Sequence, residues 1–500
     1  MTQKKSILAS TACFVSGVMM TGAQFANHWN TVMQTKNNTE LFNESTEYKR
    51  DLGLLETVSV VISRIIGSGI FRTPAPIMAL VMSTGLFGIV WVIGGIVTIF
   101  GAVCYAELVA MMPKSGGPYV YLRAAYHPIW SFLRGWAMFF VSETGAIAAV
   151  ALVFAEYTSA LYSIVTGETF SKPLIILIAL ATIWILTAVN LFGVFLSGII
   201  QNIFSWVKII AVGGIIGIAF TSGKGNFANF TTSVWPDEFS MLTVLAVGEA
   251  LRYSFFAFSG WEGATYIAEE VKNPRKNLPL SLLLGIGGVI ILYIGANSAY
   301  LYLLPVDVLS KSTWVATDAM QVAIGSAGGI LISAAVMMNT FGNVSTQILV
   351  KARSWQAMAR DGVFFKKLAK LHPKYKTPNN ALILQACWAT LLMLFAANAQ
   401  SSYEAIIDFF SANGTIFNIM TFASVIILRK KYKDLERPYK AWFYPASVII
   451  VIAIYVVFLI LTLYTVPLQS LLGLLLTSTG LLYYYRANIK SFFISRVLSK

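Results

Sequence analysis

The sequence holds few of the side chains on which metal centres, disulfide frameworks and soluble catalytic sites depend. It has 3 cysteines and 3 histidines in 500 residues, and only 12% of its residues are charged. The cysteines are scattered and odd in number, so they predict neither a disulfide framework nor a metal cluster. The histidines lie near loops or in the first 46 residues, so no histidine metal site or hydrolase triad can be built inside the apolar segments. We therefore expect no metal, no cofactor and no enzymatic activity.

Hydrophobic residues are abundant instead. They make up 57% of the chain, and apolar runs of about 20 residues recur along it. The runs are continuous rather than alternating, as in IIQNIFSWVKIIAVGGIIGIAF, which favours helices over the strands of a barrel. The sequence predicts an all-α polytopic membrane protein of about twelve transmembrane helices. The approximate spans are 52–80, 84–112, 129–165, 172–192, 194–221, 241–271, 279–304, 321–356, 380–398, 403–429, 442–464 and 467–486.

The net charge of +14 does not indicate a nucleic-acid partner, because the basic residues gather in alternate loops. Dense basic sets lie at 351–376 and 429–440, whereas the intervening loops contain little beyond Lys172, Lys224 and Lys311. Such an asymmetry places the basic loops in the cytoplasm. We expect an integral protein of the plasma or inner membrane, embedded in its lipid bilayer, with the N-terminal end of the core and the C-terminus cytoplasmic.

Residues 1–46 are similar to a secretory signal, with a basic start, an apolar stretch and small residues. Cleavage would leave the new N-terminus outside, against the charge pattern at Lys49 and Arg50. We favour a dispensable extension or an over-long start, and keep a genuine signal as the alternative.

The segment IIGSGIF, Ile65 to Phe71, places two glycines and a serine inside the first span, where they disfavour a helix. Alone, such small residues more often permit close packing of helices. The sixth span has a second interruption at Ser259 and Gly260, within FAFSGWEG. Interrupted helices at corresponding positions of two halves are typical of inverted-repeat transporters, so we expect both helices to break near the bilayer midplane.

A broken helix exposes backbone N–H groups on one side of the break and carbonyls on the other. Their partial charges match the carboxylate and the ammonium of an α-amino acid. We expect the amides of Ser68, Gly69 and Ile70 to receive the carboxylate. The carbonyls expected to receive the ammonium are those of Ile65, Phe256, Ala257 and Ser259, and the glycines that complete the two breaks are Gly67 and Gly260.

A set of motifs, in the right order, resembles the amino acid–polyamine–organocation superfamily: IIGSGIFRTP, CYAELVAMMPKSGGPYVYL, FAFSGWEGATYIAEEVKNPRKNLP, MARDGVF and LERPYK. The resemblance covers roughly Asp51 to Arg486 and is closest to the L-type amino acid transporters and the bacterial serine/threonine or alanine/serine/cysteine exchangers. It implies a LeuT-like five-plus-five inverted repeat, alternating access, amino-acid exchange and Phe256 as a lid that gates the site. The expected divisions are a core at 47–429 with repeats at about 51–221 and 241–429, two peripheral helices at 430–487, and a cytoplasmic tail at 488–500.

Lys208 lies near the middle of the fifth span, where an unpaired ammonium is costly. A lysine whose head reaches the membrane interface is the alternative. The family resemblance implies that Lys208 takes the place of a sodium ion and bonds the unwound part of the first helix to the eighth. Its expected partners are carbonyls near Gly67 and polar groups such as Ser345, and sodium-independent transport follows.

Arg64 and Glu143 are charged residues inside the first and third spans. Two interpretations stay open: a structural ion pair between them, or a Glu143 that faces the substrate side chain and favours polar or cationic substrates. Glu107, near the cytoplasmic end of the second helix, is expected to be structural. Glu249 and Arg252 are expected to form a pair on a helix surface.

The leading hypothesis is a sodium-independent antiporter of small or neutral/polar L-amino acids. The alternatives are a proton-coupled symporter, with Glu143 or Glu107 as the carboxylate, and a carrier of cationic amino acids or polyamines. A channel is disfavoured, because two unlike breaks suit one occluded site rather than a ring of equivalent groups. The loop TGETFSK has no cysteine where heavy-chain-linked members of the family carry one, so no disulfide-linked heavy chain is expected.

Overall fold

The structure is a computed structural model that describes residues 41–44, 46, 50–192, 195–360, 362–375 and 377–485. In these ranges the regular secondary structure is helical, with one isolated parallel bridge between Leu52 and Val271. The all-α prediction is confirmed. Residues 1–40 and 486–500, which hold most of the predicted N-terminal extension and the whole of the predicted tail, lie outside the described residues.

Within the described ranges, 10 helices or helical runs are long and apolar enough to cross a membrane. They are α3 (Leu54–Ile65) continued by α4 (Gly69–Arg72), α6 (Thr84–Met111), α8 (Pro128–Ala137) continued by η2 (Met138–Ser142) and α9 (Glu143–Thr166), α10 (Lys172–Leu191), α13 (Met241–Ala257) continued by η3 (Trp261–Glu270), α14 (Pro274–Leu303), α17 (Ser326–Arg360), α18 (Asn379–Ala396), α19 (Ser402–Lys431) and α20 (Ala446–Thr465). Two further helices, α11 (Phe195–Thr221) and α21 (Pro467–Tyr484), lie at the predicted fifth and twelfth spans. Together these helices occupy every predicted span.

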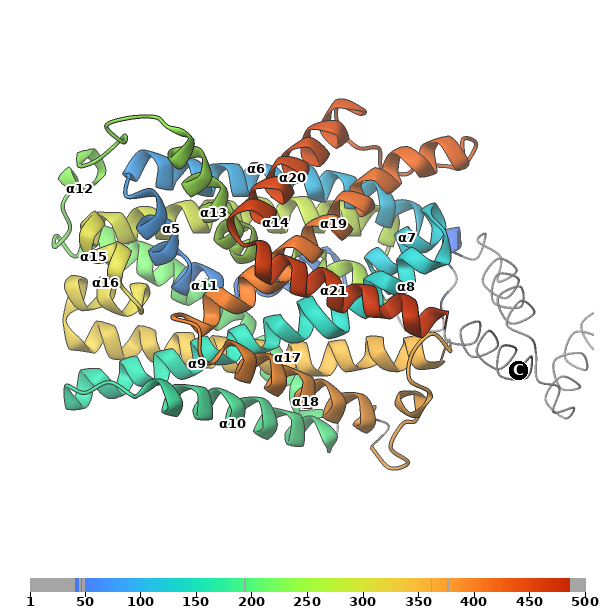
Figure 1. Ribbon diagram of the computed structural model, residues 1–500, viewed down its shortest axis with the longest axis horizontal. Coiled ribbons are helices and arrows are strands. Elements are labelled where there is room, and N and C mark those ends of the chain that lie inside the picture. Colours follow the sequence, from blue (N-terminus) through green and yellow to red (C-terminus); the bar gives the residue numbers. More distant parts are fainter. Residues whose placement is uncertain are drawn as a thin grey trace, which may run out of the picture.

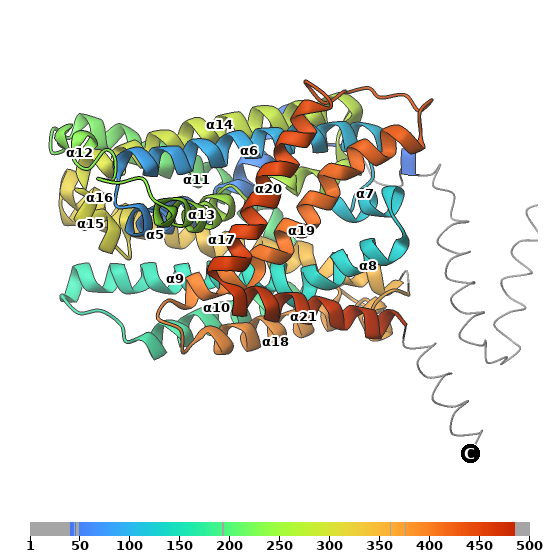
Figure 2. The ribbon, with the colours of Figure 1, turned by 45° about the horizontal axis from the view of Figure 1, so that its top comes forward.

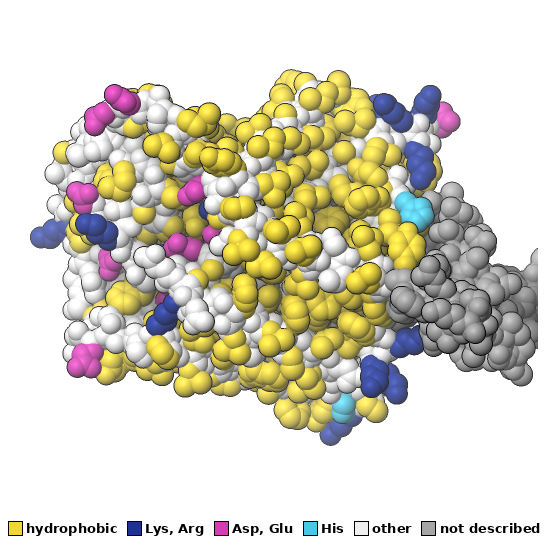
Figure 3. Space-filling view, in the orientation of Figure 1, with side chains coloured by type: hydrophobic (Ala, Val, Ile, Leu, Met, Phe, Trp, Pro, Cys, Tyr) yellow, Lys and Arg dark blue, Asp and Glu magenta, His cyan; other side chains and the backbone are white. Residues whose placement is uncertain are grey.

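Most of the spanning helices run along the long axis of the molecule, and their connections gather at its two ends (Figures 1 and 2). Lys and Arg side chains gather at the end that carries α7 and α8, while hydrophobic side chains cover the face between the ends (Figure 3). We call this end, which includes the loop 432–445, the basic end, and the opposite end the far end. The short helices are α5 (Pro74–Val81), α7 (Pro118–Ala125), α12 (Ala228–Thr231), α15 (Val306–Lys311), α16 (Val315–Ile324) and η4 (Lys366–Ala369).

The local sequence explains where several of these helices begin. The side chains of Ser83 and Ser401 accept the backbone N–H groups of Leu86 and Glu404, which caps α6 and α19. Proline occupies the first turn of α8, α10 and α14, where its missing N–H costs nothing.

Both predicted helix breaks are present. α3 ends at Ile65 and α4 begins at Gly69, while α13 ends at Ala257 and continues after a turn as the 3₁₀ segment η3. The breaks touch, since a Cβ added at Gly69 would lie 2.5 Å from the Cα of Ala257. Gly260 has a φ of +94°, and a Cβ there would lie 2.6 Å from the carbonyl oxygen of Arg64. Glycine is therefore required at both positions for the two interrupted helices to meet.

Candidate functional site

A cavity of about 190 Å³ lies where the two breaks meet. A single water needs about 10–15 Å³ of such volume, so the cavity has room for a small organic molecule. Residues of α6, α8, η2, α9, α17, α19 and α20 complete its walls. Among the described residues, no cluster of His, Cys, Asp and Glu could hold a metal ion. The predicted substrate-binding residues that line the cavity are Ile65, Gly67, Ser68, Gly69, Phe256, Ala257, Ser259 and Gly260, whereas Ile70 is buried and does not line it.

The first break presents backbone donors to this cavity. The amides of Gly67, Ser68 and Ile70 donate no backbone hydrogen bond within the described part of the chain, because α3 has ended and α4 has only begun. Gly67 and Ser68 line the cavity. An anionic group placed there would meet N–H donors that the protein fold leaves unsatisfied.

Carbonyls from both breaks meet at the hydroxyl group of Tyr293 on α14. Its oxygen lies 3.1 Å from the carbonyl oxygen of Ile65 and 3.1 Å from that of Ala257. A phenol has one proton and each carbonyl has two lone pairs, so both carbonyls keep acceptor capacity for a further donor. The carbonyl of Phe256 accepts hydrogen bonds from the amide and the hydroxyl of Ser259, at 3.0 and 2.7 Å. Sequence analysis missed Tyr293, and no local signal marks it.

A polar face of α17 borders the first break. Asn339 Nδ2 donates to the carbonyl oxygen of Gly67 at 3.4 Å, and a Cβ added at Gly67 would lie 2.9 Å from Asn343 Nδ2. Gln347 donates to Asn343 Oδ1 at 2.7 Å. Asn343, Gln347 and Lys351 all line the cavity and follow one another at four-residue intervals on one helix face. This repeat of polar side chains in an apolar span is the signal that would have identified them.

Lys208 on α11 is 4% exposed, and its Nζ donates to the carbonyl oxygen of Ser63 at 3.0 Å. Ser63 lies in the last turn of α3, just before the first break. The ammonium group therefore joins α11 to the end of the first half-helix. Ser345, the other predicted partner, lies 3.5 Å from Asn190 Nδ2, and no hydrogen bond joins it to Lys208 among the described residues.

Aromatic rings and an ion pair cover the cavity on its far-end side. The ring of Phe256 packs against Tyr403 and against Phe410 of α19, with 5.8 Å between ring centroids in each case. Arg72 lies over the Tyr403 ring, 5.3 Å from its centroid, and its Nε is 2.9 Å from a carboxylate oxygen of Glu156. These contacts join α4, α9 and α19 next to the ring of Phe256.

Among the described residues, the ion-pair partner of Arg252 is Asp408 and not Glu249, which the sequence suggested. Arg252 is 4% exposed and lines the cavity. Its Nε donates to Asp408 of α19 at 3.0 Å, and its Nη1 donates to the hydroxyl of Thr465 at 2.6 Å. The prediction was wrong because α19 and α20 pack over this face of α13.

The carboxylate of Glu143 on α9 pairs with the Nζ of Lys351 on α17, and both side chains line the cavity. Arg64 and Glu262 also line it, but Arg64 forms no ion pair with Glu143 among the described residues. Glu143 therefore has a partner that sequence analysis did not identify.

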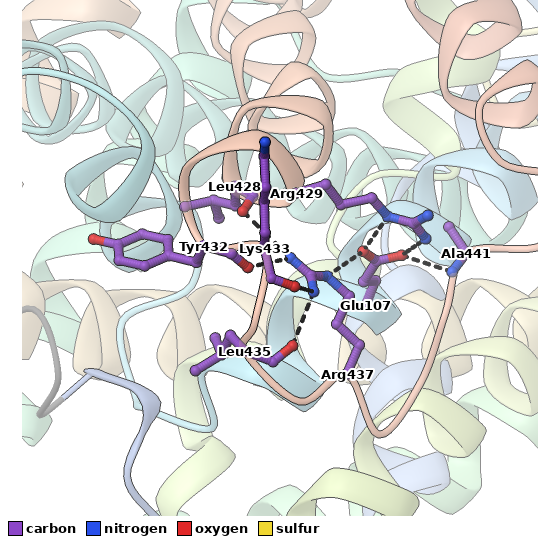
Figure 4. Close-up of polar contacts among 8 residues, drawn as sticks. All are labelled: Glu107, Leu428, Arg429, Tyr432, Lys433, Leu435, Arg437 and Ala441. Carbon is purple, nitrogen blue, oxygen red and sulfur yellow. Dashed lines mark hydrogen bonds and ion pairs between the residues drawn. The ribbon is translucent and has the colours of Figure 1, made fainter.

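A second buried carboxylate, that of Glu107 on α6, lies outside the cavity (Figure 4). It accepts hydrogen bonds from Nε and Nη2 of Arg429 at 2.8 and 2.6 Å, and from the amide of Ala441 at 2.7 Å. Arg437 lies 3.7 Å from the same carboxylate and donates to backbone carbonyls of the loop 432–445. This Glu107 cluster holds the end of α19 and that loop against α6, in agreement with the structural role expected for Glu107.

The chain is similar to known amino acid transporters over most of its length. A family model described as amino acid permease matches residues 52–484. The b(0,+)-type amino acid transporter 1 of Mus musculus is 31% identical over 426 residues, which are 85% of each chain. The serine/threonine exchanger SteT of Bacillus subtilis (strain 168) is 31% identical over 445 residues, 88% of this chain and 98% of that relative. The large neutral amino acids transporter small subunit 2 of Mus musculus is 32% identical over 439 residues, 87% of this chain and 81% of that relative.

Proposed function

The chain belongs to the amino acid permease family, and on that premise we propose that it exchanges amino acids across a membrane by alternating access. One observation carries the proposal. Two broken membrane helices meet at a cavity, with free amides at the first break and carbonyls at both. Paired breaks of this kind form the substrate sites of inverted-repeat transporters.

In this mechanism the two breaks bind the carboxylate and the ammonium group that all α-amino acids share. The amides of Gly67, Ser68 and Gly69 receive the carboxylate, since Ile70 does not line the cavity. The carbonyls of Ile65, Ala257 and Ser259 receive the ammonium, because the Phe256 carbonyl already accepts two hydrogen bonds from Ser259. Phe256 lies over the site and acts as the lid on its far-end side, where its ring already contacts α19. A substrate can leave toward the far end only when the Phe256 ring moves away from α19 and the ion pair between Arg72 and Glu156 breaks.

We propose small or neutral, polar L-amino acids as substrates. The name of the Bacillus subtilis relative specifies serine and threonine, and that of one mouse relative specifies large neutral amino acids. The amide side chains of Asn343 and Gln347 offer donors and acceptors without net charge beside the first break. Such groups suit a polar neutral side chain.

We propose that exchange is sodium-independent, and the position of Lys208 supports this proposal. Its ammonium group already donates a hydrogen bond to a carbonyl at the end of α3. A sodium ion at the same place would meet electrostatic repulsion. We propose that the protein lies in the plasma or inner membrane with its basic end facing the cytoplasm, because basic loops remain on the cytoplasmic side.

Proton-coupled symport is the weaker alternative. The Glu107 carboxylate is occupied by a guanidinium group and a backbone amide, and that of Glu143 by Lys351. A carrier of cationic amino acids or polyamines is also less favoured, since a cationic substrate would have to compete with Lys351 for Glu143. We further propose that no disulfide-linked partner is needed, because the loop 166–172 contains no cysteine.

Purified protein in proteoliposomes tests the proposal. Uptake of labelled serine should require unlabelled amino acid inside the vesicles and should be unchanged when sodium is replaced by choline. A proton gradient should not drive uptake into empty vesicles. Accumulation in empty vesicles under a pH gradient would instead establish the proton-coupled alternative.

A further inference from the structure

The ion pair between Glu143 and Lys351 is a feature of the cavity that the exchange mechanism above does not use. The two side chains are 13% and 8% exposed, and both line the cavity. In the part of the chain that the structure describes, no other ion pair joins two cavity-lining side chains. The cavity wall therefore presents a carboxylate and an ammonium group that neutralise each other.

The position of Glu143 is set by an unusual turn. α9 begins at Glu143 directly after the π-helical segment η2, a widened turn of a kind often found at functional sites. The carbonyls near this turn are satisfied by side chains: that of Phe139 accepts from the Thr144 hydroxyl at 2.5 Å, and that of Phe140 from Trp388 Nε1 at 2.7 Å. Neighbouring groups thus stabilise the widened turn and hold the carboxylate at the cavity wall.

Lys351 continues the polar face that Asn343 and Gln347 form on α17. Helical side chains lean toward the N-terminus of their helix, and α17 begins at the far end, so Lys351 leans toward the breaks. Lys351 follows Asn343, which lies against Gly67, by two four-residue intervals in the direction of the basic end, so the pair lies on the basic-end side of the first break. A substrate whose backbone groups are held at the breaks can point its side chain toward this pair.

Of the other guanidinium groups of the cavity wall, those of Arg252 and Arg64 have a carboxylate nearby, whereas that of Arg134 has an aromatic ring, which stabilises its charge without neutralising it. Arg252 is bound to Asp408, and Arg64 shares the wall with the carboxylate of Glu262. The guanidinium carbon of Arg134 lies 5.6 Å from the centroid of an aromatic ring of α19. Removal of either member of the Glu143–Lys351 pair would accordingly leave the other charge in the cavity wall without its ion-pair partner.

We propose that the Glu143–Lys351 pair selects substrates by the charge of their side chains. The intact pair admits neutral side chains and rejects ionised ones, because either sign of charge meets a like charge at close range. The inference rests on the proposed exchange function and assigns it a specificity determinant.

The test neutralises each member separately. Lys351→Met leaves the Glu143 carboxylate unpaired, so exchange of lysine and ornithine relative to serine should rise by about tenfold or more. Glu143→Gln leaves the Lys351 ammonium unpaired, so exchange of aspartate and glutamate relative to serine should rise by a similar factor. The double variant E143Q/K351M should keep serine exchange within about threefold of wild type and gain neither charged class.

Lys114→Met is the matched control. Lys114 pairs with Glu269 at 3.8 Å near the basic end, and neither residue lines the cavity. This substitution removes the same charge and should leave the substrate preference unchanged. Each variant is measured by exchange in proteoliposomes and by the thermal stabilisation that each amino acid gives the purified protein.

The outcomes separate the two proposals. Opposite gains in the two single variants support the charge selection. Three results would overturn the charge selection while the exchange function stands. The first is wild-type exchange of lysine or glutamate as fast as that of serine, and the second is an equal loss for all substrates in both single variants. The third is loss of serine exchange in the double variant. Wild-type protein that neither binds nor exchanges any amino acid would overturn the proposed function and this inference together. Because the double variant leaves neither Glu143 nor Lys351 as a lone charge, it gives a result even where a single variant does not fold.

Discussion

Glu107 and Glu143 are both carboxylates inside apolar helices, yet the structure gives them opposite surroundings. The Glu107 side chain is 0% exposed and lies between Arg429, Arg437 and a backbone amide, away from any cavity. Glu143 has Lys351 as its ion-pair partner, and its carboxylate forms part of the cavity wall.

The difference teaches how to separate structural from functional charges in a membrane helix. A carboxylate can accept about four hydrogen bonds, and the Glu107 cluster uses most of this capacity within the protein. The Glu143 carboxylate keeps acceptor capacity beside open volume. We expect substitutions in the Glu107 cluster to reduce the amount of folded protein, and substitutions around the cavity to reduce transport by protein that still folds.

The largest effect is expected for Glu107→Ala. It leaves two guanidinium groups without their buried carboxylate, which costs about 3–5 kcal/mol of folding stability. The yield and the melting temperature of the detergent-solubilised protein measure the effect. Glu436→Ala is the control, because Glu436 is 80% exposed and its pair with Arg275 contributes little. An E107A protein as stable as wild type would remove the distinction between the two glutamates.

Gly69→Ala comes next and tests the contact between the breaks. The added methyl group would overlap the backbone of Ala257, so α4 and α13 must move apart by the order of 1 Å. A misplacement of this size costs about 100-fold in a site that depends on alignment, and we expect such a loss in exchange rate with protein still present in the membrane. Gly88→Ala is the control, since a Cβ there meets nothing within 4 Å. Normal exchange by G69A would show that the breaks need not touch.

Lys208→Met should lower the exchange rate by about tenfold, the effect of losing an interhelical hydrogen bond of roughly 1–2 kcal/mol in a membrane. Methionine fills the same volume, so the melting temperature should change little. Lys224→Met, at an exposed loop position, is the control. If K208M exchanges serine normally, Lys208 has no part in the mechanism.

Phe256→Ala should have the smallest effect. Its two aromatic contacts with α19 contribute about 1 kcal/mol to closure, so the apparent affinity for serine should fall roughly fivefold. Titration of exchange against external serine measures this change. Phe395→Ala, at a 65% exposed position on α18, should leave the affinity unaltered. Equal affinity in F256A and wild type would contradict the lid role.

The sequence predicted the features that depend on local composition. The spans follow from hydropathy, and the breaks follow from the poor helix propensity of Gly67, Ser68 and Gly69 and of Ser259 and Gly260. Both kinds of signal are contained in a short stretch of chain.

The partners of the charged groups could not be predicted in the same way. Lys351 is 208 positions from Glu143, and Asp408 is 156 positions from Arg252. Which of these side chains meet depends on how each helix is rotated about its axis, and the hydropathy of an apolar run does not determine that rotation. The π turn before Glu143 changes the rotation of α9 without any glycine or proline to mark it.

The hydroxyl group of Tyr293 has consequences for how the two halves of the site can move. It has one proton for two carbonyls, so at any moment only one of α3 and α13 is bonded to it by a full hydrogen bond. When these helices separate, the hydroxyl group can keep its hydrogen bond to either carbonyl, so no buried donor is left without an acceptor. Tyr293 therefore adds little to the energy barrier for the separation of α3 and α13, and its hydroxyl group can form a hydrogen bond both before and after they separate.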